Sequence, residues 1–264
     1  MPVLRKNRLR ELMRKDRPTI GTRMISSWPG IMEVIGYTGA IDYVEFVSEY
    51  GSYDLYALDE LARASELFEM STMIKIDAEP RTFISQRAIG SGIQNVLFAD
   101  IRDVKDAEEA VRAVRPEPKG WNGCSMRRVG GYLLECGTPK FVEYCNDVVV
   151  AFMIEKKSAI DNLEEILSVD GVDMVQFGPC DYSMSIGMPG QRAHPKVKEA
   201  EMKIIKTALK FDVHPRAEIN SVGDAQKYID LGVRDFSINT DIVILYQWLK
   251  ESGEALQEIL KKNF

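Results

Sequence analysis

The chain has 264 residues, of which 45% are apolar and 28% are charged, and its formal net charge is −6. This composition is ample for one large core and ordinary for a soluble protein. The negative charge argues against nucleic acid as the main partner, because that binding depends on neutralising phosphates. The sequence contains no apolar run near the roughly 18 residues of a membrane span, so no membrane partner is expected.

The first fifteen residues are basic and lack the apolar stretch of a secretory signal, so we expect a solvated first helix there. The cysteines show no CxxC pair that would indicate a zinc site or a disulfide framework. They are Cys124, Cys136, Cys145 and Cys180. A reducing cytoplasm fits this cysteine usage best.

Strand-like and helix-like segments alternate along almost the whole chain. The predicted strands are 19–25, 43–48, 72–77, 95–101, 148–154, 174–177, 215–219 and 235–239. The predicted helices are 29–39, 55–68, 81–91, 104–115, 158–169, 195–211, 222–231 and 242–262, with a loop at 116–137 and a short extra helix at 139–146. Eight such units predict a single (β/α)₈ barrel over residues 1–264. The doubly wound alternative would need a glycine-rich phosphate turn after the first strand, and none is present.

In such a barrel the active site lies where the strands end, so polar residues at strand ends are candidates. They are Arg23, Glu49, Lys75, Asp100, Glu155, Asp181, Glu218 and Asp241. Glu155 follows a strongly apolar strand, and a buried carboxylate needs a partner or a metal. Asp181 follows the next strand, so both carboxylates could reach one Mg²⁺ or Mn²⁺ ion. The alternative is that Glu155 pairs with Lys75 or Arg23 and holds no metal.

Three segments resemble the HpcH/HpaI family of metal-dependent 2-oxo acid aldolases. They are Val47-Ser48-Glu49-Tyr50-Gly51; Met153-Ile154-Glu155 with the helix after it; and Gly178-Pro179-Cys180-Asp181-Tyr182-Ser183 with Gly187, Gly190 and His194-Pro195. The third is the most specific, because its Gly, Pro, Asp and Ser spacing is that of the family. The resemblance implies that Glu155 and Asp181 hold the metal and that Gly178, Pro179 and Cys180 contact the substrate.

The departures from the family pattern concern the groups that handle protons and charge. The family's Asp and His proton-transfer pair is replaced by Val47 and Tyr50, which leaves Glu49 between them. The family's enolate-stabilising Arg is Lys75, and a family Trp is Arg23. Met153 replaces a Gln, and the loop motif Gly-x-Arg-Gly reads Gly120-Trp121-Asn122-Gly123.

The resemblance implies a carbon–carbon lyase that acts on a 2-oxo acid through a metal-stabilised enolate. Lys75, Tyr50, Arg23 and Glu49 are then the candidate catalytic residues, although Lys75 could instead form a Schiff base and Tyr50 could only line the pocket. Because the Asp/His pair is missing, decarboxylation, hydration or tautomerisation of an oxo acid is an alternative, and a non-catalytic oxo acid binder is another.

The partners implied by the resemblance are a small 2-oxo acid substrate and further copies of the chain. The family forms hexamers by exchanging C-terminal helices, and a trimer is also possible. The apolar run Ile242-Val243-Ile244-Leu245 with Trp248 gives the expected helix 242–262 a face suited to such an exchange, or to packing on its own barrel.

Overall fold

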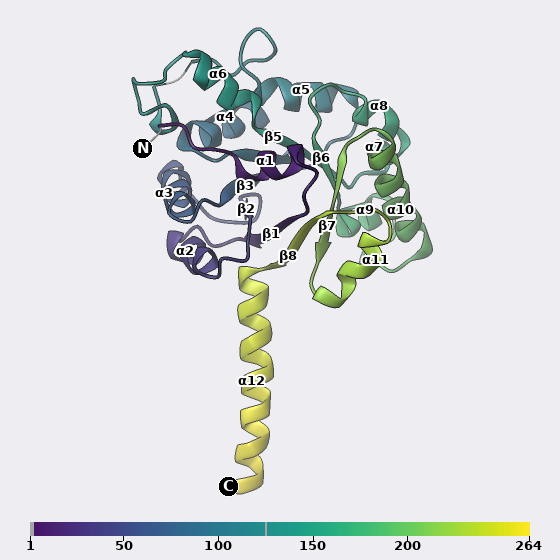
Figure 1. Ribbon diagram of the computed structural model, residues 1–264. Coiled ribbons are helices and arrows are strands. Elements are labelled where there is room, and N and C mark those ends of the chain that lie inside the picture. Colours follow the sequence, from purple (N-terminus) through teal and green to yellow (C-terminus); the bar gives the residue numbers. More distant parts are fainter. Residues whose placement is uncertain (1–2, 125) are drawn as a thin grey trace.

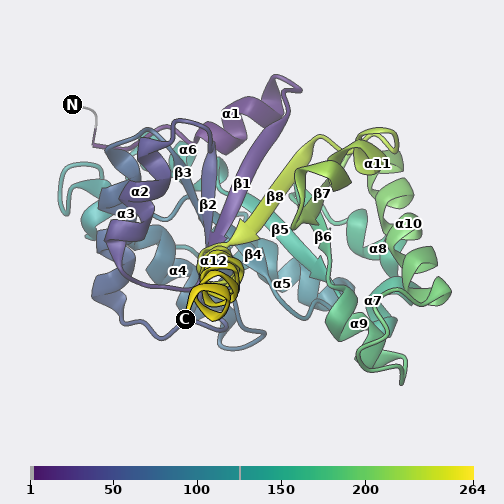
Figure 2. The same cartoon turned by 90° about the horizontal axis from the view of Figure 1, so that it is seen from below.

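The computed structural model of the chain describes residues 3–124 and 126–264, and its eight parallel strands close into one barrel in sequential order. The strands are β1 (Thr19–Met24), β2 (Tyr43–Val47), β3 (Ser71–Ile76), β4 (Asn95–Phe98), β5 (Val149–Ile154), β6 (Met174–Phe177), β7 (His214–Ile219) and β8 (Asp235–Thr240). The helices surround this ring (Figure 2). The predicted (β/α)₈ barrel is therefore confirmed.

The helices agree with the predicted ones except at three places. They are α1 (Arg8–Arg14), α2 (Pro29–Tyr37), α3 (Leu55–Glu66), α4 (Arg81–Ser91), α5 (Val104–Val114), α6 (Pro139–Asn146), α7 (Lys157–Asp161), α8 (Leu163–Leu167), α9 (Pro179–Ser185), α10 (Pro195–Lys210), α11 (Ala225–Ile229) and α12 (Asp241–Asn263). The helix predicted over 158–169 is split at Asn162 into α7 and α8. The one predicted over 222–231 begins as a 3₁₀ turn. The short α9 was not predicted, because seven residues carry too little periodicity.

The fourth strand ends at Phe98, earlier than the predicted 101, for a conformational reason. Asp100 has φ of +56°, a left-handed conformation that cannot continue a strand. The chain therefore turns at Asp100 and presents its backbone N–H to the barrel mouth, where the candidate site lies.

Helix α1 closes the N-terminal end of the barrel instead of lying in solvent. Leu9 and Met13 are buried with Tyr43, Met73 and Leu97 in a cluster inside the barrel. The basic residues of α1 lie on its other side, where Arg10 binds Asp173 at 2.6 Å. The expectation of a solvated first helix is thus wrong for its apolar face, since the open end of a barrel needs an apolar cover.

The middle of the barrel holds a fully buried ion pair. Arg216 on β7 lies 2.5 Å from Glu45 on β2, and both side chains are at most 1% exposed. The Arg216 guanidinium also lies over the ring of Tyr43, 5.3 Å from its centroid. Burying two charges is costly unless they compensate each other, so this pair links opposite walls of the barrel.

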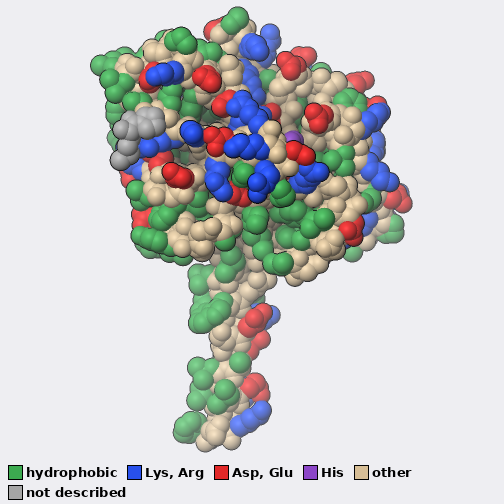
Figure 3. All heavy atoms as spheres, viewed as in Figure 1, with side chains coloured by type: hydrophobic (Ala, Val, Ile, Leu, Met, Phe, Trp, Pro, Cys, Tyr) green, Lys and Arg blue, Asp and Glu red, His purple; other side chains and the backbone are tan. Residues whose placement is uncertain are grey.

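Helix α12 projects away from the barrel (Figure 1). None of its residues is buried, and its apolar side chains are exposed. Figure 3 shows hydrophobic side chains along one side of this helix and charged side chains along the other. Within 3–124 and 126–264, no helix combines the length and the apolar character needed to cross a bilayer.

Candidate functional site

The carboxylate of Glu155 lies at the C-terminal end of β5 and is only 2% exposed. Its Oε1 accepts a hydrogen bond of 3.1 Å from the backbone N–H of Asp100. Its Oε2 faces Gly178, where an added Cβ would lie 2.4 Å from this oxygen. Burial raises the pKa of Glu155, although the nearby Lys75 ammonium opposes that shift. Position 178 thus has to be glycine for the carboxylate to fit.

Asp181 belongs to the first turn of α9, and not to a strand end as the sequence suggested. Gly178 follows β6 and Pro179 begins this helix, and the Asp181 carboxylate lies close enough to Glu155 for its charge to raise the pKa of Glu155. The Nζ of Lys156 lies 3.5 Å from Asp181 Oδ1 and 2.7 Å from Asp100 Oδ1. Sequence reasoning missed Lys156, although its position directly after Glu155 was the available signal.

Lys75 and Glu49 form an ion pair at the mouth of the barrel. The Lys75 Nζ lies 2.5 Å from Glu49 Oε2 and 5.0 Å from the centroid of the Tyr50 ring. Burial alone would lower the pKa of Lys75, but the carboxylates of Glu155 and Glu49 outweigh it and hold the pKa above its usual value. A Schiff base needs a neutral amine, so this environment argues against that role. Partial burial raises the pKa of Tyr50, which keeps the phenol neutral.

Arg23 and Glu218 form a second ion pair at the mouth, between β1 and β7. Arg23 Nη1 lies 2.6 Å from Glu218 Oε1, and Gln176 Nε2 donates to Glu218 Oε2 at 2.8 Å. Arg23 Nε also donates to the carbonyl of Asn239 at 3.3 Å. The contacts between Arg23, Glu218 and Gln176 connect β1, β7 and β6 across the mouth.

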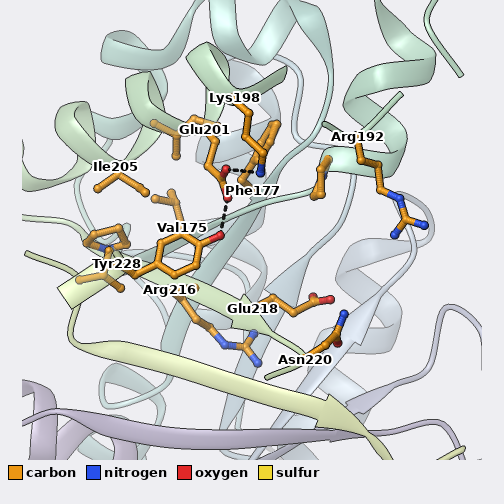
Figure 4. Close-up of a pocket in the computed structure, with 15 residues that line it drawn as sticks. Val175, Phe177, Arg192, Lys198, Glu201, Ile205, Arg216, Glu218, Asn220 and Tyr228 are labelled. Atoms are coloured by element: carbon orange, nitrogen blue, oxygen red, sulfur yellow. Dashed lines mark hydrogen bonds and ion pairs between the residues drawn. The ribbon is translucent and has the colours of Figure 1, made fainter. Parts of the chain in front are cut away.

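A cavity of about 190 Å³ lies beside β7, between the barrel wall and α10 (Figure 4). Glu218 and Asn220 line it near the end of β7, and Arg192 comes from the loop after α9. Deeper in, Tyr228 donates to Glu201 at 2.7 Å, and Lys198 pairs with the same carboxylate.

The two histidines lie outside the mouth and have structural contacts. His194 begins α10, where its Nδ1 accepts from the Lys196 N–H at 3.2 Å. His214 begins β7 at the other end of the barrel, and its Nδ1 lies 2.8 Å from Asp235. The candidate Asp241 has a structural role, because its oxygens accept the N–H groups of Ile25 and Ser26 at 3.0 Å each.

The arrangement can hold a divalent cation through two carboxylates. No group of three or more His, Cys, Asp or Glu side chains suited to a metal occurs in the described parts of the chain. Glu155 and Asp181 would therefore leave several coordination positions for water and substrate, as oxygen-liganded Mg²⁺ usually does. Glycine at position 178 lets the Glu155 carboxylate pack against the backbone that leads to Asp181.

The chain is thus a (β/α)₈ barrel with paired carboxylates and cations at its C-terminal mouth, where enzymes of this fold have their active sites. The family model described as HpcH/HpaI aldolase/citrate lyase matches residues 52–239, so the chain belongs to that family. The predicted aldolase-type carbon–carbon lyase is thereby confirmed at the level of the family.

Relatives of known activity agree with this assignment. The chain is 24% identical to 5-keto-4-deoxy-D-glucarate aldolase of Klebsiella pneumoniae over 96% of this chain and 97% of that protein. It is 28% identical to hydroxypyruvate/pyruvate aldolase of Roseobacter denitrificans, covering 85% and 89%. It is 31% identical to 4-hydroxy-2-oxo-heptane-1,7-dioate aldolase of Escherichia coli over 58% of this chain and 59% of that enzyme.

Solved structures share the fold. Macrophomate synthase superposes with a TM-score of 0.89 at 18% identity, covering 100% of this chain and 93% of that one. An HpcH/HpaI aldolase from Desulfitobacterium hafniense superposes with a TM-score of 0.86 at 21% identity, covering 96% and 98%.

A methyl group at position 178 should disturb the site without disturbing the barrel. In Gly178→Ala the new Cβ would clash with Glu155 Oε2, so we expect Mn²⁺ affinity measured by calorimetry to fall by about 10- to 100-fold, the range seen for changes next to metal ligands. Gly253→Ala is the control, because no atom lies within 4 Å of its added Cβ. Unchanged Mn²⁺ affinity in a folded Gly178→Ala would contradict this geometry.

Proposed function

We propose that the chain is a divalent-metal-dependent lyase that cleaves a 4-hydroxy-2-oxo acid into an aldehyde and pyruvate or a pyruvate analogue. Mg²⁺ or Mn²⁺ would bind at Glu155 and Asp181. The observation that carries this is the environment of Glu155: in the described chain no Lys or Arg forms an ion pair with this buried carboxylate. Lys75 and Arg23, its candidate partners, are held by other carboxylates. The cysteine usage supports a cytoplasmic setting.

A bound Mg²⁺ or Mn²⁺ would orient the carboxylate and keto oxygens of a 2-oxo acid and withdraw electrons from the carbonyl. Lys75 carries a permanent positive charge near Glu155 and would stabilise the negative charge that develops on the keto oxygen when the C3–C4 bond breaks. Gly178, Pro179 and Cys180 surround the ligand Asp181 and would form the wall against which the 2-oxo group lies.

Tyr50 would serve as a proton donor and not as a base. Its raised pKa keeps the hydroxyl protonated at neutral pH, and its ring lies over Lys75. The phenol could therefore protonate C3 of the enolate after cleavage, while Glu49 fixes the position of the Lys75 ammonium. A water molecule at the mouth would accept the proton of the 4-hydroxyl group as the C3–C4 bond breaks, and this proton would pass back to Tyr50 to complete the cycle.

The replacement of the family's Asp/His pair by Val47 and Tyr50 supports a second candidate. The same enolate chemistry would then end in decarboxylation, hydration or tautomerisation of an oxo acid. Release of pyruvate from a panel of 4-hydroxy-2-oxo acids would distinguish the lyase from this alternative and from a non-catalytic binder.

Asp181 provides the direct test of the metal site. In Asp181→Asn the neutral amide is a poor metal ligand, so Mn²⁺ affinity measured by calorimetry should fall by at least about 100-fold, more than outer-shell changes cause. The matched control is Asp161→Asn on α7, whose exposed carboxylate pairs with Lys157. An Asp181→Asn protein that melts like the parent and binds Mn²⁺ equally well would exclude this site.

The lost proton-transfer pair gives a test of the reaction. General acid–base groups contribute about 10²–10⁴-fold, so the parent should cleave simple 4-hydroxy-2-oxo acids slowly. Val47→Asp with Tyr50→His should raise that rate by about 100-fold and more than either change alone, measured as pyruvate release. Because Val47 is buried, circular dichroism must first show that the variant is folded.

A parent rate equal to that of the Roseobacter relative under the same conditions would show that another group transfers the proton. The same conclusion would follow if the folded double variant were no faster than Tyr50→His alone. In either case Tyr50 would only line the pocket.

We also propose that the chain forms an oligomer, a hexamer or trimer, in which α12 is exchanged between subunits. A groove of about 550 Å³ between α2 and the start of α12 is lined mostly by apolar side chains. They include Ile31, Val34, Ile244, Leu245 and Trp248. An exposed 23-residue amphipathic helix and this groove would cover each other if α12 of a second copy lay here.

Charges on the apolar face of α12 should therefore disrupt assembly. Ile244→Asp with Trp248→Asp is expected to lower the mass measured by light scattering to that of a monomer, because buried unpaired carboxylates are costly. Lys250→Asp, at an exposed position of the same helix, should leave the mass unchanged. An unchanged oligomer in the double variant would place the interface elsewhere.

A further inference from the structure

We propose that Glu218 determines which substrate the mouth accepts: by holding the guanidinium of Arg23, it selects a 2-oxo acid whose far end is uncharged and hydroxylated over one that ends in a second carboxylate. This inference rests on the proposed function, because it takes the 2-oxo group to lie at Glu155 and Asp181. It names the substrate class of that site and adds Glu218 as its specificity residue.

Arg23 is fixed from two sides, and so is Glu218. The 2.6 Å ion pair occupies one oxygen of Glu218, and the Gln176 amide occupies the other. The Arg23 side chain is 16% exposed and also donates to the Asn239 carbonyl. A substrate carboxylate could bind Arg23 fully only by displacing Glu218, whose carboxylate would then lack its cation while only 34% of its side chain is exposed.

The order of the strands places this pair on the side of Glu155 and Asp181 that lies away from Lys75. Glu155 ends β5 and Asp181 follows β6, while Lys75 stands on β3 to one side of them. On the other side of β6, the ring continues with β7, β8 and β1. Glu218 stands on β7 and Arg23 on β1. With Lys75 beside the 2-oxo group, the carbons beyond that group would extend toward this pair.

The other cations at the mouth are also occupied. Lys75 contacts Glu49 at 2.5 Å, and Lys156 contacts Asp100 at 2.7 Å. A second substrate carboxylate would meet the charge of Glu218 and cations that are already neutralised. A hydroxyl group, in contrast, can donate to Glu218 and accept from Arg23 without displacing either. A preference for a hydroxylated end would distinguish the substrate of this chain from that of the 4-hydroxy-2-oxo-heptane-1,7-dioate aldolase, whose named substrate ends in a second carboxylate.

Arg192 is the competing site for an anionic end. It lines the cavity beside β7 together with Asn220 and lies in a segment outside the barrel ring (Figure 4). A substrate reaching out of the mouth past Glu218 could place a carboxylate there. The test therefore needs a variant at this position as well.

The experiment uses two ligands that mimic 2-oxo acids and are not turned over. N-oxalylglycine ends in a carboxylate, and N-(2-hydroxyethyl)oxamate of the same length ends in a hydroxyl. Binding to the full-length, Mn²⁺-loaded protein is measured by calorimetry, with oxalate as the reference that fills only the metal-chelating part. The variants are Glu218→Gln, Glu218→Asp, Arg192→Gln and Arg23→Gln with Glu218→Gln, and thermal melting confirms that each is folded.

We expect the parent to bind the hydroxyethyl ligand about tenfold or more tighter than N-oxalylglycine. In Glu218→Gln the order should reverse, because the freed guanidinium makes charge-assisted hydrogen bonds to the carboxylate. The reversal should disappear when Arg23 is also removed, and Glu218→Asp should keep the parent's preference. Glu108→Gln on the outer face of α5 removes the same charge far from the mouth and should change neither ligand.

The proposal is overturned if the parent binds N-oxalylglycine at least as tightly as the hydroxyethyl ligand, or if Glu218→Gln leaves their ratio unchanged. Tight N-oxalylglycine binding that is lost in Arg192→Gln would place anion recognition in the outer cavity instead. Failure of the Mn²⁺-loaded parent to bind oxalate overturns the proposed function together with this inference, whereas normal oxalate binding with the wrong ligand preference overturns the inference alone.

Discussion

Charge compensation inside a closed ring is the constraint on which the rest of this structure depends. Closure removes the interior from bulk water, so a charge placed there must have a partner. Arg216 and Glu45 satisfy this in the middle of the barrel, and the pairs Lys75–Glu49 and Arg23–Glu218 satisfy it at the mouth. The carboxylate of Glu155 differs from these: it accepts a backbone N–H and packs against Gly178, and the charge of Lys75 acts on it without a direct ion pair among the described residues.

If Glu155 and Asp181 hold a metal as proposed, this pattern explains how the other groups of the site could change while both carboxylates are kept. Replacing the Asp/His pair by Val47 and Tyr50 removes one carboxylate from the mouth, and Lys75 keeps the positive charge that the family places there as Arg. Arg23 adds a cation on β1, and Glu218 supplies the carboxylate that neutralises it. In the proposed reaction, the replacements would thus change the groups that move protons and contact the far end of the substrate, while Glu155 and Asp181 are retained.

The same closure accounts for the shape of the molecule. The eight strands leave no free edge, and α1 covers the N-terminal opening with Leu9 and Met13. Helix α12 is not needed to close the ring and leaves its end with none of its residues buried, so the apolar groove beside α2 is left open as well (Figure 1). An apolar face of this length exposed to water is the physical reason to look for a second copy as its cover.

The sequence by itself determined the class of fold and the identity of the family, because alternating apolar strands and amphipathic helices recur eight times and the segment from Gly178 to Ser183 has a specific spacing. It also predicted that Glu155, Lys75, Glu49 and Arg23 lie at one mouth, since parallel strands all end on the same side. Local periodicity could not show the short α9 that carries Asp181, nor that α1 has a buried face.

Only the tertiary structure decided which charges pair. Arg23 and Glu218 are far apart in the sequence, and Lys75 could have paired with Glu155 as well as with Glu49. Which partner each charged side chain finds depends on the strand order around the ring and on which side chains point inward at the same level along the barrel axis. Both are fixed when the barrel closes between β1 and β8.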